Sequence, residues 1–392
     1  MERTHAWANQ YGKPRWCTER RGVVVEPWLA LVNAVIVCGG SRSRVSDPGE
    51  APEGGRPVAQ RAQLGTPVSL GVIGAGAIGK VHLEVLADAD QRDFRVAAVA
   101  DPARHDSESG IRTYRDHREL LAREDIHAVA VNTPPREHHQ IVVEALRAGK
   151  HVLVEKPPAL TVPECEDMIQ VAVATERVLF MAYHARYHPA VDLARSVLAT
   201  QKVVEIGIEY RELITNYHDP DSWIFDPRVA GGGVLMDSGI NALSVVTAVL
   251  PGPFTYRIDR AELARPDGVR VETRASVDFT FGVDGGGRLE MDWLHHGQET
   301  RRITFATETD AYAVDVVADQ LTQNDVPLIG AVGGTRRAVD QHSEYRGVYQ
   351  DFAQHLLHGT SSTSTVELAF IADAYAWRDM DGGAGPGGGV AV

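Results

Sequence analysis

This sequence has few cysteines and no excess of positive charge. Its 392 residues include three cysteines, Cys17, Cys38 and Cys165, none of which has C-x-x-C spacing. An odd number without that spacing argues against a disulfide framework and a bound metal, and is typical of a reducing compartment. The formal net charge of −14 argues against nucleic acid and anionic membranes, because both bind positive surfaces. We therefore expect a cytoplasmic protein with small-molecule partners.

The apolar run near the N-terminus is too short for a membrane span. It extends from Trp28 to Cys38, whereas a spanning helix needs about 20 apolar residues. Two arginines before it resemble a twin-arginine export signal, but Glu26 and Pro27 interrupt the segment and no clean cleavage site follows. We expect residues 1–66 to be a disordered or spurious extension and the Gly-rich residues 380–392 to be a disordered tail.

What the sequence does contain is a glycine motif between a strand-like and a helix-like segment. Gly74, Gly76 and Gly79 follow an apolar run and open a helical pattern, as in a dinucleotide-binding fingerprint. The first glycine would allow a tight turn, the second a close approach of the backbone to a pyrophosphate, and the third close helix–strand packing. The phosphates would lie at the helix N-terminus. The motif therefore predicts a dinucleotide site.

Asp101 decides which dinucleotide is preferred. It ends the next strand-like run, roughly 20 residues after the glycines, where a carboxylate accepts hydrogen bonds from the adenosine ribose. A 2′-phosphate would bring negative charge against this carboxylate, so the sequence favours NAD over NADP. Arg104 and His105 lie close enough along the chain to offset some of the repulsion. Use of NADP therefore stays open.

The order of the elements predicts two domains. Strands are expected at Ser69–Ile73, Phe94–Ala100, His127–Asn132 and His151–Glu155, with helices at Ala77–Ala87 and Arg136–Ala148. This alternation predicts a doubly wound parallel sheet of the Rossmann type at residues 67–188. Alternating runs then predict an α+β domain with an open, mostly antiparallel sheet at residues 189–379, with strands at Val203–Glu212, Val271–Phe281, Gly287–Trp293 and Arg302–Thr307. Two amphipathic helices, Tyr345–Leu357 and Val366–Trp377, are expected to pack back on the first domain.

Two short motifs fall at carboxyl ends of the predicted parallel strands, where such sheets bind ligands. One is Asn132-Thr133-Pro134-Pro135 and the other is Glu155-Lys156-Pro157. The second supplies an amine. A general base works best with a pKa near the working pH, and a lysine approaches this only where burial or a nearby positive charge lowers its pKa from about 10.4.

These motifs resemble those of the glucose-fructose oxidoreductase, inositol dehydrogenase and MocA (Gfo/Idh/MocA) family, over roughly Val68 to Asp379. The resemblance is carried by Gly71–Gly79, by Asn132–Pro135 and by Ala148–Pro157. The second half is most similar to bacterial aldose 1-dehydrogenases acting on D-galactose and L-arabinose, through the segments His184–Ala190, His218–Ile224 and Asp237–Leu243. Many relatives place a catalytic histidine where this chain has Asn241, which matches the aldose branch rather than the inositol branch.

The resemblance implies oxidation of the anomeric carbon of a pyranose to an aldonolactone, with hydride transfer to NAD or NADP. Lys156 and Asp237 would be the catalytic residues, and the sequence leaves open which of them takes the proton. Glu212 and Asn241 would bind sugar hydroxyls, Trp293 and Tyr217 would be stacking platforms, and the remaining predicted sugar-site residues are His184 and His218. The predicted cofactor-binding residues are Gly74, Gly76, Ala77, Ile78, Gly79, Asp101, Asn132, Thr133, Pro134, His138, Glu155 and Lys156.

Several alternatives stay open at this level. The chain could be a family relative that acts on inositol or a modified sugar, or a non-catalytic sensor that binds NAD(P) and sugar. The lysine of Glu155-Lys156-Pro157 argues against a sensor, which needs no such amine. Taken singly, His184, His218, Glu212 and Trp293 could be surface or core residues, and adjacent His295 and His296 diverge on a strand, which disfavours a metal site. The resemblance also implies a homodimer that pairs through the open sheet.

Overall fold

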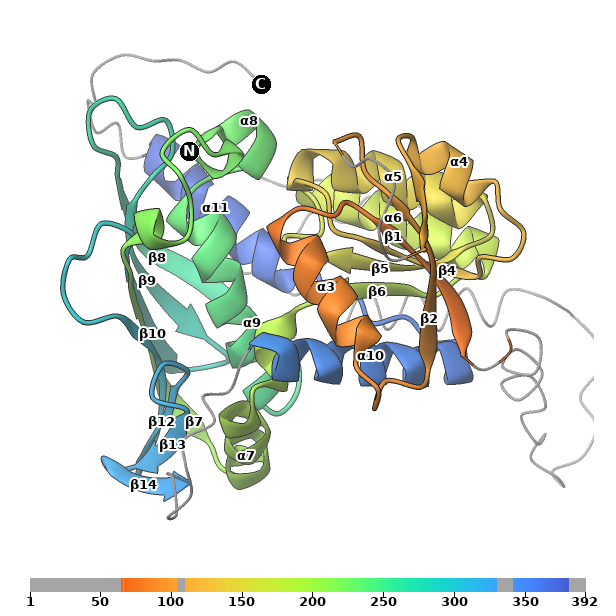
Figure 1. Cartoon of the computed structure of the whole chain (residues 1–392). Helices are drawn as coiled ribbons and strands as arrows, with labels where there is room; N and C mark the ends of the chain where they lie inside the picture. Colours follow the sequence, from red (N-terminus) through yellow and green to blue (C-terminus); the bar gives the residue numbers. More distant parts are fainter. Residues whose placement is uncertain (1–64, 66, 104–109, 330–340, 381–392) are drawn as a thin grey trace, which may run out of the picture.

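The computed structural model describes residue 65 and residues 67–103, 110–329 and 341–380 (Figure 1). Residues 1–64 and 66 of the expected extension, residues 381–392 of the expected tail, and Arg104 and His105 therefore lie outside the described residues. The domain limits given above stay a prediction. The described chain forms two sheets, each flanked by helices (Figure 1).

The first sheet contains six parallel strands in the order β3-β2-β1-β4-β5-β6. The strands are β1 Val68–Ile73, β2 Phe94–Ala100, β3 Arg112–Tyr114, β4 Ala128–Val131, β5 His151–Glu155 and β6 Leu179–Ala182. Its helices are α3 Ala77–Ala87, α4 His117–Leu121, α5 Pro135–Arg147 and α6 Val162–Thr175. The predicted Rossmann sheet is confirmed, and the short edge strand β3 and strand β6 complete it. The strand order reverses between β1 and β4, which places a crevice at the ends of these strands.

The second sheet has eight strands in the order β14-β13-β12-β11-β7-β10-β9-β8. They are β7 Val203–Arg211, β8 Tyr256–Ala264, β9 Arg274–Phe281, β10 Gly285–Asp292, β11 Thr300–Thr307, β12 Ala311–Asp315, β13 Gln320–Gln323 and β14 Val326–Ile329. Side chains of β9 alternate between buried and accessible positions, as expected for a sheet with one covered face. The pairing is antiparallel except between β7 and β10, which are parallel. The prediction of an open, mostly antiparallel sheet is confirmed.

Helices cover only one face of this second sheet (Figure 1). They include α7 Pro189–Leu198, α8 Pro227–Ala230, α9 Ile240–Val249 and α11 Val366–Met380, with a π-helical turn η4 at Leu235–Gly239 leading into α9. The segment Pro227–Val249 is long and apolar enough to cross a membrane, but 78% of its apolar window is buried inside the fold. Within this segment, η4 and α9 form the buried core helix of the second domain.

The two C-terminal helices pack on different domains. Helix α10, Gln341–His358, lies against α3 and β6 of the first domain, as predicted (Figure 1). Helix α11 instead packs mainly on β8, where the Phe370 ring contacts Tyr256 and Phe279. The expectation that both helices return to the first domain is thus wrong for α11. Its apolar face matches the aromatic inner surface of the second sheet, a match that helical periodicity alone does not reveal.

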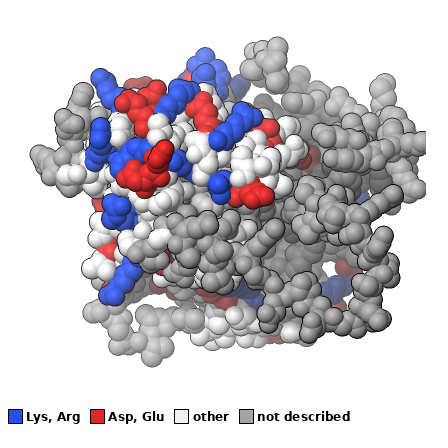
Figure 2. All heavy atoms as spheres, turned by 90° about the vertical axis from the view of Figure 1, so that its right-hand side faces the viewer, with Lys and Arg blue, Asp and Glu red and all other residues white. Residues whose placement is uncertain are grey.

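Acidic and basic side chains are mixed on the side of the molecule that Figure 2 shows. The visible described residues on this face alternate in sign and form no continuous positive patch. Long-range attraction of a polyanion requires such a patch. The described residues visible in this view therefore do not form the charge pattern that attracts a polyanion.

His151, at the start of β5, should make the stability of the fold depend on pH. Burial, with the charges of Arg177 and His127, lowers the pKa of its imidazole from 6.5 to about 4, and its Nδ1 accepts the Val178 N–H at 3.0 Å. The unfolded chain takes up this proton near pH 6.5 and the folded chain does not until about pH 4, so stability is complete above pH 6.5 and is lost as pH falls. The loss amounts to about 3 kcal/mol at most.

Urea unfolding at several pH values between 7 and 4 measures this dependence. His151→Asn keeps an acceptor for the Val178 N–H but cannot titrate in this range, so its free energy of unfolding should fall less steeply with pH than that of the wild type. Equal pH slopes for the two proteins would contradict the assignment.

Candidate active site

The glycine-rich turn joins β1 to α3 at the strand reversal. Gly74 has φ of +88°, and a Cβ there would lie 2.8 Å from the Asn132 backbone. A Cβ on Gly79 would lie 2.2 Å from the Gly74 carbonyl oxygen. By contrast, no atom of the described residues lies within 4 Å of a Cβ built on Gly76. The fold itself thus requires the first and third glycines, whereas the second leaves space for a ligand against the backbone. Ala77 and Ile78 begin α3 beside that space.

Buried polar atoms without partners border this turn. Asn132, which follows β4, is 5% exposed, and neither its amide oxygen nor its amide nitrogen has a hydrogen-bond partner among the described residues. The hydroxyl of Thr133 is also buried and unpartnered. Buried polar groups are normally hydrogen-bonded. The orphaned atoms and the open face of Gly76 therefore fit a polar ligand such as a dinucleotide.

Asp101 lies at the carboxyl end of β2, next to the turn. Its Oδ2 accepts the backbone N–H of Ala75 at 2.7 Å, and its Oδ1 accepts the N–H of Ala103 at 2.8 Å. These bonds fix the carboxylate beside the glycine turn. It is positioned as the ribose-binding acid of a Rossmann sheet is.

Lys156 and Asp237 form a close ion pair between the two domains. Lys156 follows β5, Asp237 lies in η4, and Lys156 Nζ is 2.6 Å from Asp237 Oδ1. The side chains are 15% and 30% exposed, so the pair remains accessible. Burial would raise the pKa of the Asp237 carboxyl, but the charge and hydrogen bond of Lys156 outweigh burial and hold that pKa below its usual value. The charges of His218 and Arg301 act in the same direction.

Glu212 is the centre of a second polar cluster, just after β7. Its buried carboxylate accepts hydrogen bonds from the Ser238 hydroxyl at 2.6 Å, the Trp293 indole N–H at 3.0 Å and the Arg301 guanidinium at 2.7 Å. Arg301 also pairs with Glu299 at 2.8 Å. Ser238 follows Asp237 directly in the chain, so this cluster and the ion pair share the η4 turn.

The structure places the other predicted sugar-site residues differently. Asn241 Oδ1 is buried without a partner among the described residues, and His218 is close enough for its charge to act on Asp237. Tyr217 is 54% exposed, and its hydroxyl donates to Glu299 at 2.7 Å. The ring of Trp293 has no exposed surface, so it supports Glu212 instead of offering a face to a sugar.

Two of the predicted site residues, His184 and His138, form hydrogen bonds between different elements of the fold. His184 Nδ1 lies 2.6 Å from the Glu344 carboxylate of α10. His138 is fully buried, with its nitrogens 2.7 Å from the Thr133 carbonyl and 2.9 Å from the Pro157 carbonyl. It therefore connects the loops that follow β4 and β5. The loop of Pro134 is thereby joined to that of Glu155 and Lys156.

Sequence reasoning missed Arg301 and Ser238. Arg301 is one of many arginines, and it lies far along the chain from Glu212, so no local spacing marks it. Ser238 is marked only by its place beside Asp237. Among the described residues, no group of three or more His, Cys, Asp or Glu side chains could hold a metal ion.

Gly76, Asp101 and Asn132 would hold a dinucleotide at the carboxyl ends of β1, β2 and β4, and Lys156 follows the neighbouring strand β5. This combination is that of a nucleotide-dependent oxidoreductase. The chain belongs to the Gfo/Idh/MocA oxidoreductase family with an NAD-binding Rossmann fold, whose model matches residues 68–183. The resemblance predicted from the motifs is thus confirmed, and with it an enzyme that uses NAD.

Individual relatives support the same family. The chain is 30% identical over 310 residues to galactose 1-dehydrogenase of Pseudomonas fluorescens, covering 79% of this chain and 95% of the relative. The crystal structure of D-galactose-1-dehydrogenase from Rhizobium etli matches with a TM-score of 0.70 and 29% identity, over 79% of this chain and 95% of that one. Levoglucosan dehydrogenase in complex with NADH and L-sorbose shares the fold, with a TM-score of 0.66, 20% identity, and coverage of 79% and 96%.

Proposed function

We propose that this protein is an NAD-dependent aldose 1-dehydrogenase that oxidises a pyranose of the D-galactose or L-arabinose type at C1 to the aldonolactone. The observation that carries the proposal is the accessible contact between Lys156 and Asp237 beside the dinucleotide crevice. The similarity to two galactose 1-dehydrogenases over most of the chain supports the choice of sugar. Asn241, in place of a histidine, supports the aldose branch.

The ion pair supplies the proton chemistry of the reaction. Oxidation at C1 breaks the C1–H bond and the O–H bond of the C1 hydroxyl, and bound NAD⁺ supplies the hydride acceptor. The hydroxyl proton passes to the Lys156–Asp237 pair, whose members contact each other at 2.6 Å and can exchange it. The lowered pKa of Asp237 keeps its carboxylate charged at neutral pH, ready to accept a hydrogen bond from the hydroxyl.

Asn241 and Arg301 are the best-placed groups for the other sugar hydroxyls. Among the described residues, neither the buried Oδ1 acceptor of Asn241 nor the buried Nε donor of Arg301 has a hydrogen-bond partner. Glu212 already receives three hydrogen bonds. We therefore assign Glu212, with Trp293, to holding Ser238 and Arg301 in place, and Tyr217 and His218 to the rim of the site.

Initial rates with a panel of sugars test the proposed function. Purified protein should form NADH with D-galactose or L-arabinose, and D-fucose, D-glucose and myo-inositol complete the panel. Activity on myo-inositol alone would move the protein to an inositol-type branch. NADH binding without turnover of any sugar would contradict the aldose assignment and favour a modified-sugar substrate or a sensor.

Asp101→Ala should reduce the preference for NAD. The variant removes an acceptor for ribose hydroxyls, so the affinity for NADH should fall by about ten-fold or more, as expected for a hydrogen bond to a charged group. It also removes the negative charge that opposes a 2′-phosphate, so the affinity for NADPH should fall less or increase. Fluorescence titration gives both dissociation constants, and an unchanged ratio of the two would remove Asp101 from cofactor selection.

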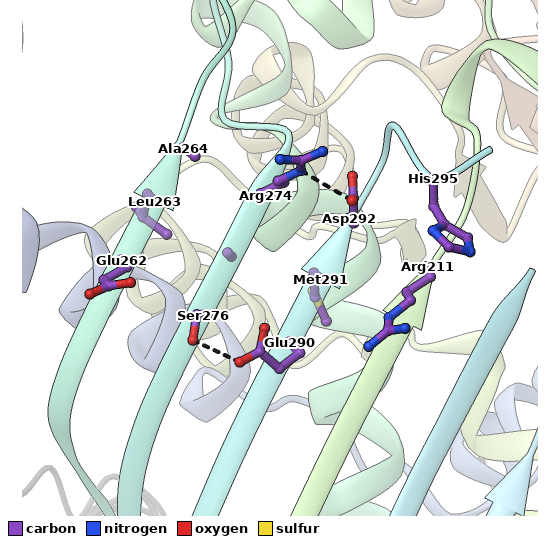
Figure 3. A pocket seen from close by; sticks show the side chains of 11 residues that line it. Arg211, Glu262, Leu263, Ala264, Arg274, Ser276, Glu290, Met291, Asp292 and His295 are labelled. Atoms are coloured by element: carbon purple, nitrogen blue, oxygen red, sulfur yellow. Dashed lines mark hydrogen bonds and ion pairs between the residues drawn. The ribbon is translucent and has the colours of Figure 1, made fainter. Parts of the chain in front are cut away.

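We also propose a homodimer formed through the open face of the second sheet. This face bears a hollow of about 480 Å³ between β8, β9, β10 and the end of β7 (Figure 3). Charges of both signs line it, including the Arg274–Asp292 pair at 3.1 Å and the Ser276–Glu290 hydrogen bond at 3.0 Å. Mixed charges suit pairing with an identical surface, because each sign meets the other across a two-fold axis.

Light scattering after size exclusion tests the assembly. The wild type should have the mass of a dimer, and Ser276→Trp, in the lining of the hollow, should shift it toward a monomer. Ser196→Trp on the exposed side of α7 is the matched control and should leave the mass unchanged. A monomeric wild type would contradict the proposed dimer.

A further inference from the structure

A buried carboxylate fixes the backbone at Lys156. Glu155 is 2% exposed, and its Oε2 accepts the backbone N–H of Lys156 at 3.0 Å. Its Oε1 lies 2.9 Å from Nε2 of His82. Burial would raise the pKa of the Glu155 carboxyl, but the hydrogen bond from His82 and the neighbouring imidazoles of His82 and His184 act against burial, and the pKa is lowered. The carboxylate is thus charged, and its two oxygens join α3 to the residue that carries the catalytic amine.

His82 in turn depends on the C-terminal helix α10. It is completely buried in α3, and its Nδ1 lies 2.7 Å from the hydroxyl of Tyr349. A neutral imidazole has one donor and one acceptor. The tautomer with hydrogen on Nε2 donates to Glu155 and accepts from Tyr349, so one protonation state satisfies both contacts.

Packing on α10 restrains the same imidazole. The ring of Tyr345 lies between His82 and His184, with centroids 4.6 Å and 5.1 Å away. Glu344 anchors His184 at 2.6 Å. A ring enclosed in this way has little freedom to turn, so the direction of its Nε2–H bond toward Glu155 is fixed.

We propose that His82 and Tyr349 are positioning residues of the reaction, which through Glu155 set the place from which Lys156 reaches Asp237. The chain of contacts runs from Tyr349 Oη to His82, Glu155, the Lys156 backbone and Asp237. The lysine side chain has four rotatable bonds, so its amine stays in contact with Asp237 only if its backbone is held. This inference rests on the proposed role of Lys156.

Removing one hydroxyl tests the proposal with little disturbance. Tyr349→Phe should lower kcat by about 10- to 100-fold, the cost of a misplacement of about 1 Å in an active site. The sugar KM and the NADH Kd should change less than about two-fold, because His82 and Tyr349 are both completely buried. His82→Leu should lower kcat further, and His82→Gln, which restores an N–H near Glu155, should recover part of it.

Tyr256→Phe is the matched control. Tyr256 is also a buried tyrosine, and its hydroxyl donates to the Asp373 carboxylate at 2.9 Å, but it lies in the second domain. The Tyr256→Phe variant should lower the melting temperature about as much as Tyr349→Phe does, and it should leave kcat unchanged. A wild-type kcat in both Tyr349→Phe and His82→Leu, or an equal loss in Tyr256→Phe, would overturn the proposal.

Chemical labelling of Lys156 separates this proposal from the proposed function. Limiting acetic anhydride followed by mass spectrometry reports how accessible and free the amine is, without any substrate. Labelling should be several-fold faster in Tyr349→Phe and His82→Leu than in the wild type and in Tyr256→Phe. If the wild type oxidises no sugar but this difference appears, the function fails and the positioning role stands. Equal labelling in all four proteins would overturn the positioning role.

Discussion

Lys156→Met should lower kcat by about 10³-fold, within the range typical of losing a general acid or base, and leave the NADH dissociation constant within a few-fold of the wild type. Methionine keeps an unbranched, flexible side chain that is one atom shorter, and it removes the charged amine. The amine that contacts Asp237 at 2.6 Å is then missing, while the glycine turn is untouched. Steady-state rates and NADH fluorescence titration measure the two effects.

Lys150→Met is the control that β5 itself provides. Lys150 precedes this strand as Lys156 follows it, and its amine donates to the carbonyls of Arg123 at 2.6 Å and Ile126 at 2.9 Å. Its replacement should lower the melting temperature and spare kcat. If Lys156→Met weakens NADH as much as it lowers kcat, the lysine serves the cofactor rather than the proton transfer.

Gly76→Ala and Gly79→Ala should have different effects: the first should weaken NADH binding, and the second should destabilise the fold. A Cβ on Gly76 meets no described atom within 4 Å, so Gly76→Ala should keep the melting temperature and weaken NADH by about 10- to 100-fold, equivalent to the roughly 1–3 kcal/mol of an overpacked contact. A Cβ on Gly79 would lie 2.2 Å from the Gly74 carbonyl, so Gly79→Ala should lower the melting temperature sharply.

Thermal unfolding and NADH titration of the two variants form the measurement. Intact NADH binding in a folded Gly76→Ala protein would mean that the pyrophosphate does not lie against this backbone. A fully stable Gly79→Ala protein would contradict the close contact between α3 and the turn.

The first domain could be predicted well because its signals are local. The limits of α3, β2 and β5 were given correctly, since apolar runs and a glycine turn mark their ends in the sequence itself. Strand β3 contains only three residues, too few for a periodic pattern. The packing of α11 depends on aromatic rings of a sheet formed elsewhere in the chain, so its partner domain was predicted wrongly.

The candidate site, like the fold, could be predicted from sequence only where its signals are local. Lys156 and Asp237 were singled out from motifs, and the structure brings them into contact although 81 positions separate them. The partners of Glu212 could not be predicted, because Trp293 reaches it from the turn after β10 and Arg301 from β11, and only the folded sheet sets the register of these strands. His82 stands three positions after Gly79 on an apolar helix, and a polar residue there was the one available signal for the buried cluster.

The contacts of α10 mean that the nucleotide-binding half is discontinuous in sequence. A fragment that stops after β6 would contain all six strands and the glycine turn, yet it would expose Phe94 and Phe180, which the Phe352 ring covers in the whole protein. The hydroxyl that His82 contacts would also be missing. A helix that follows the whole second sheet in the chain therefore completes the first domain, so the core of the nucleotide-binding half closes only after the second domain has been synthesised.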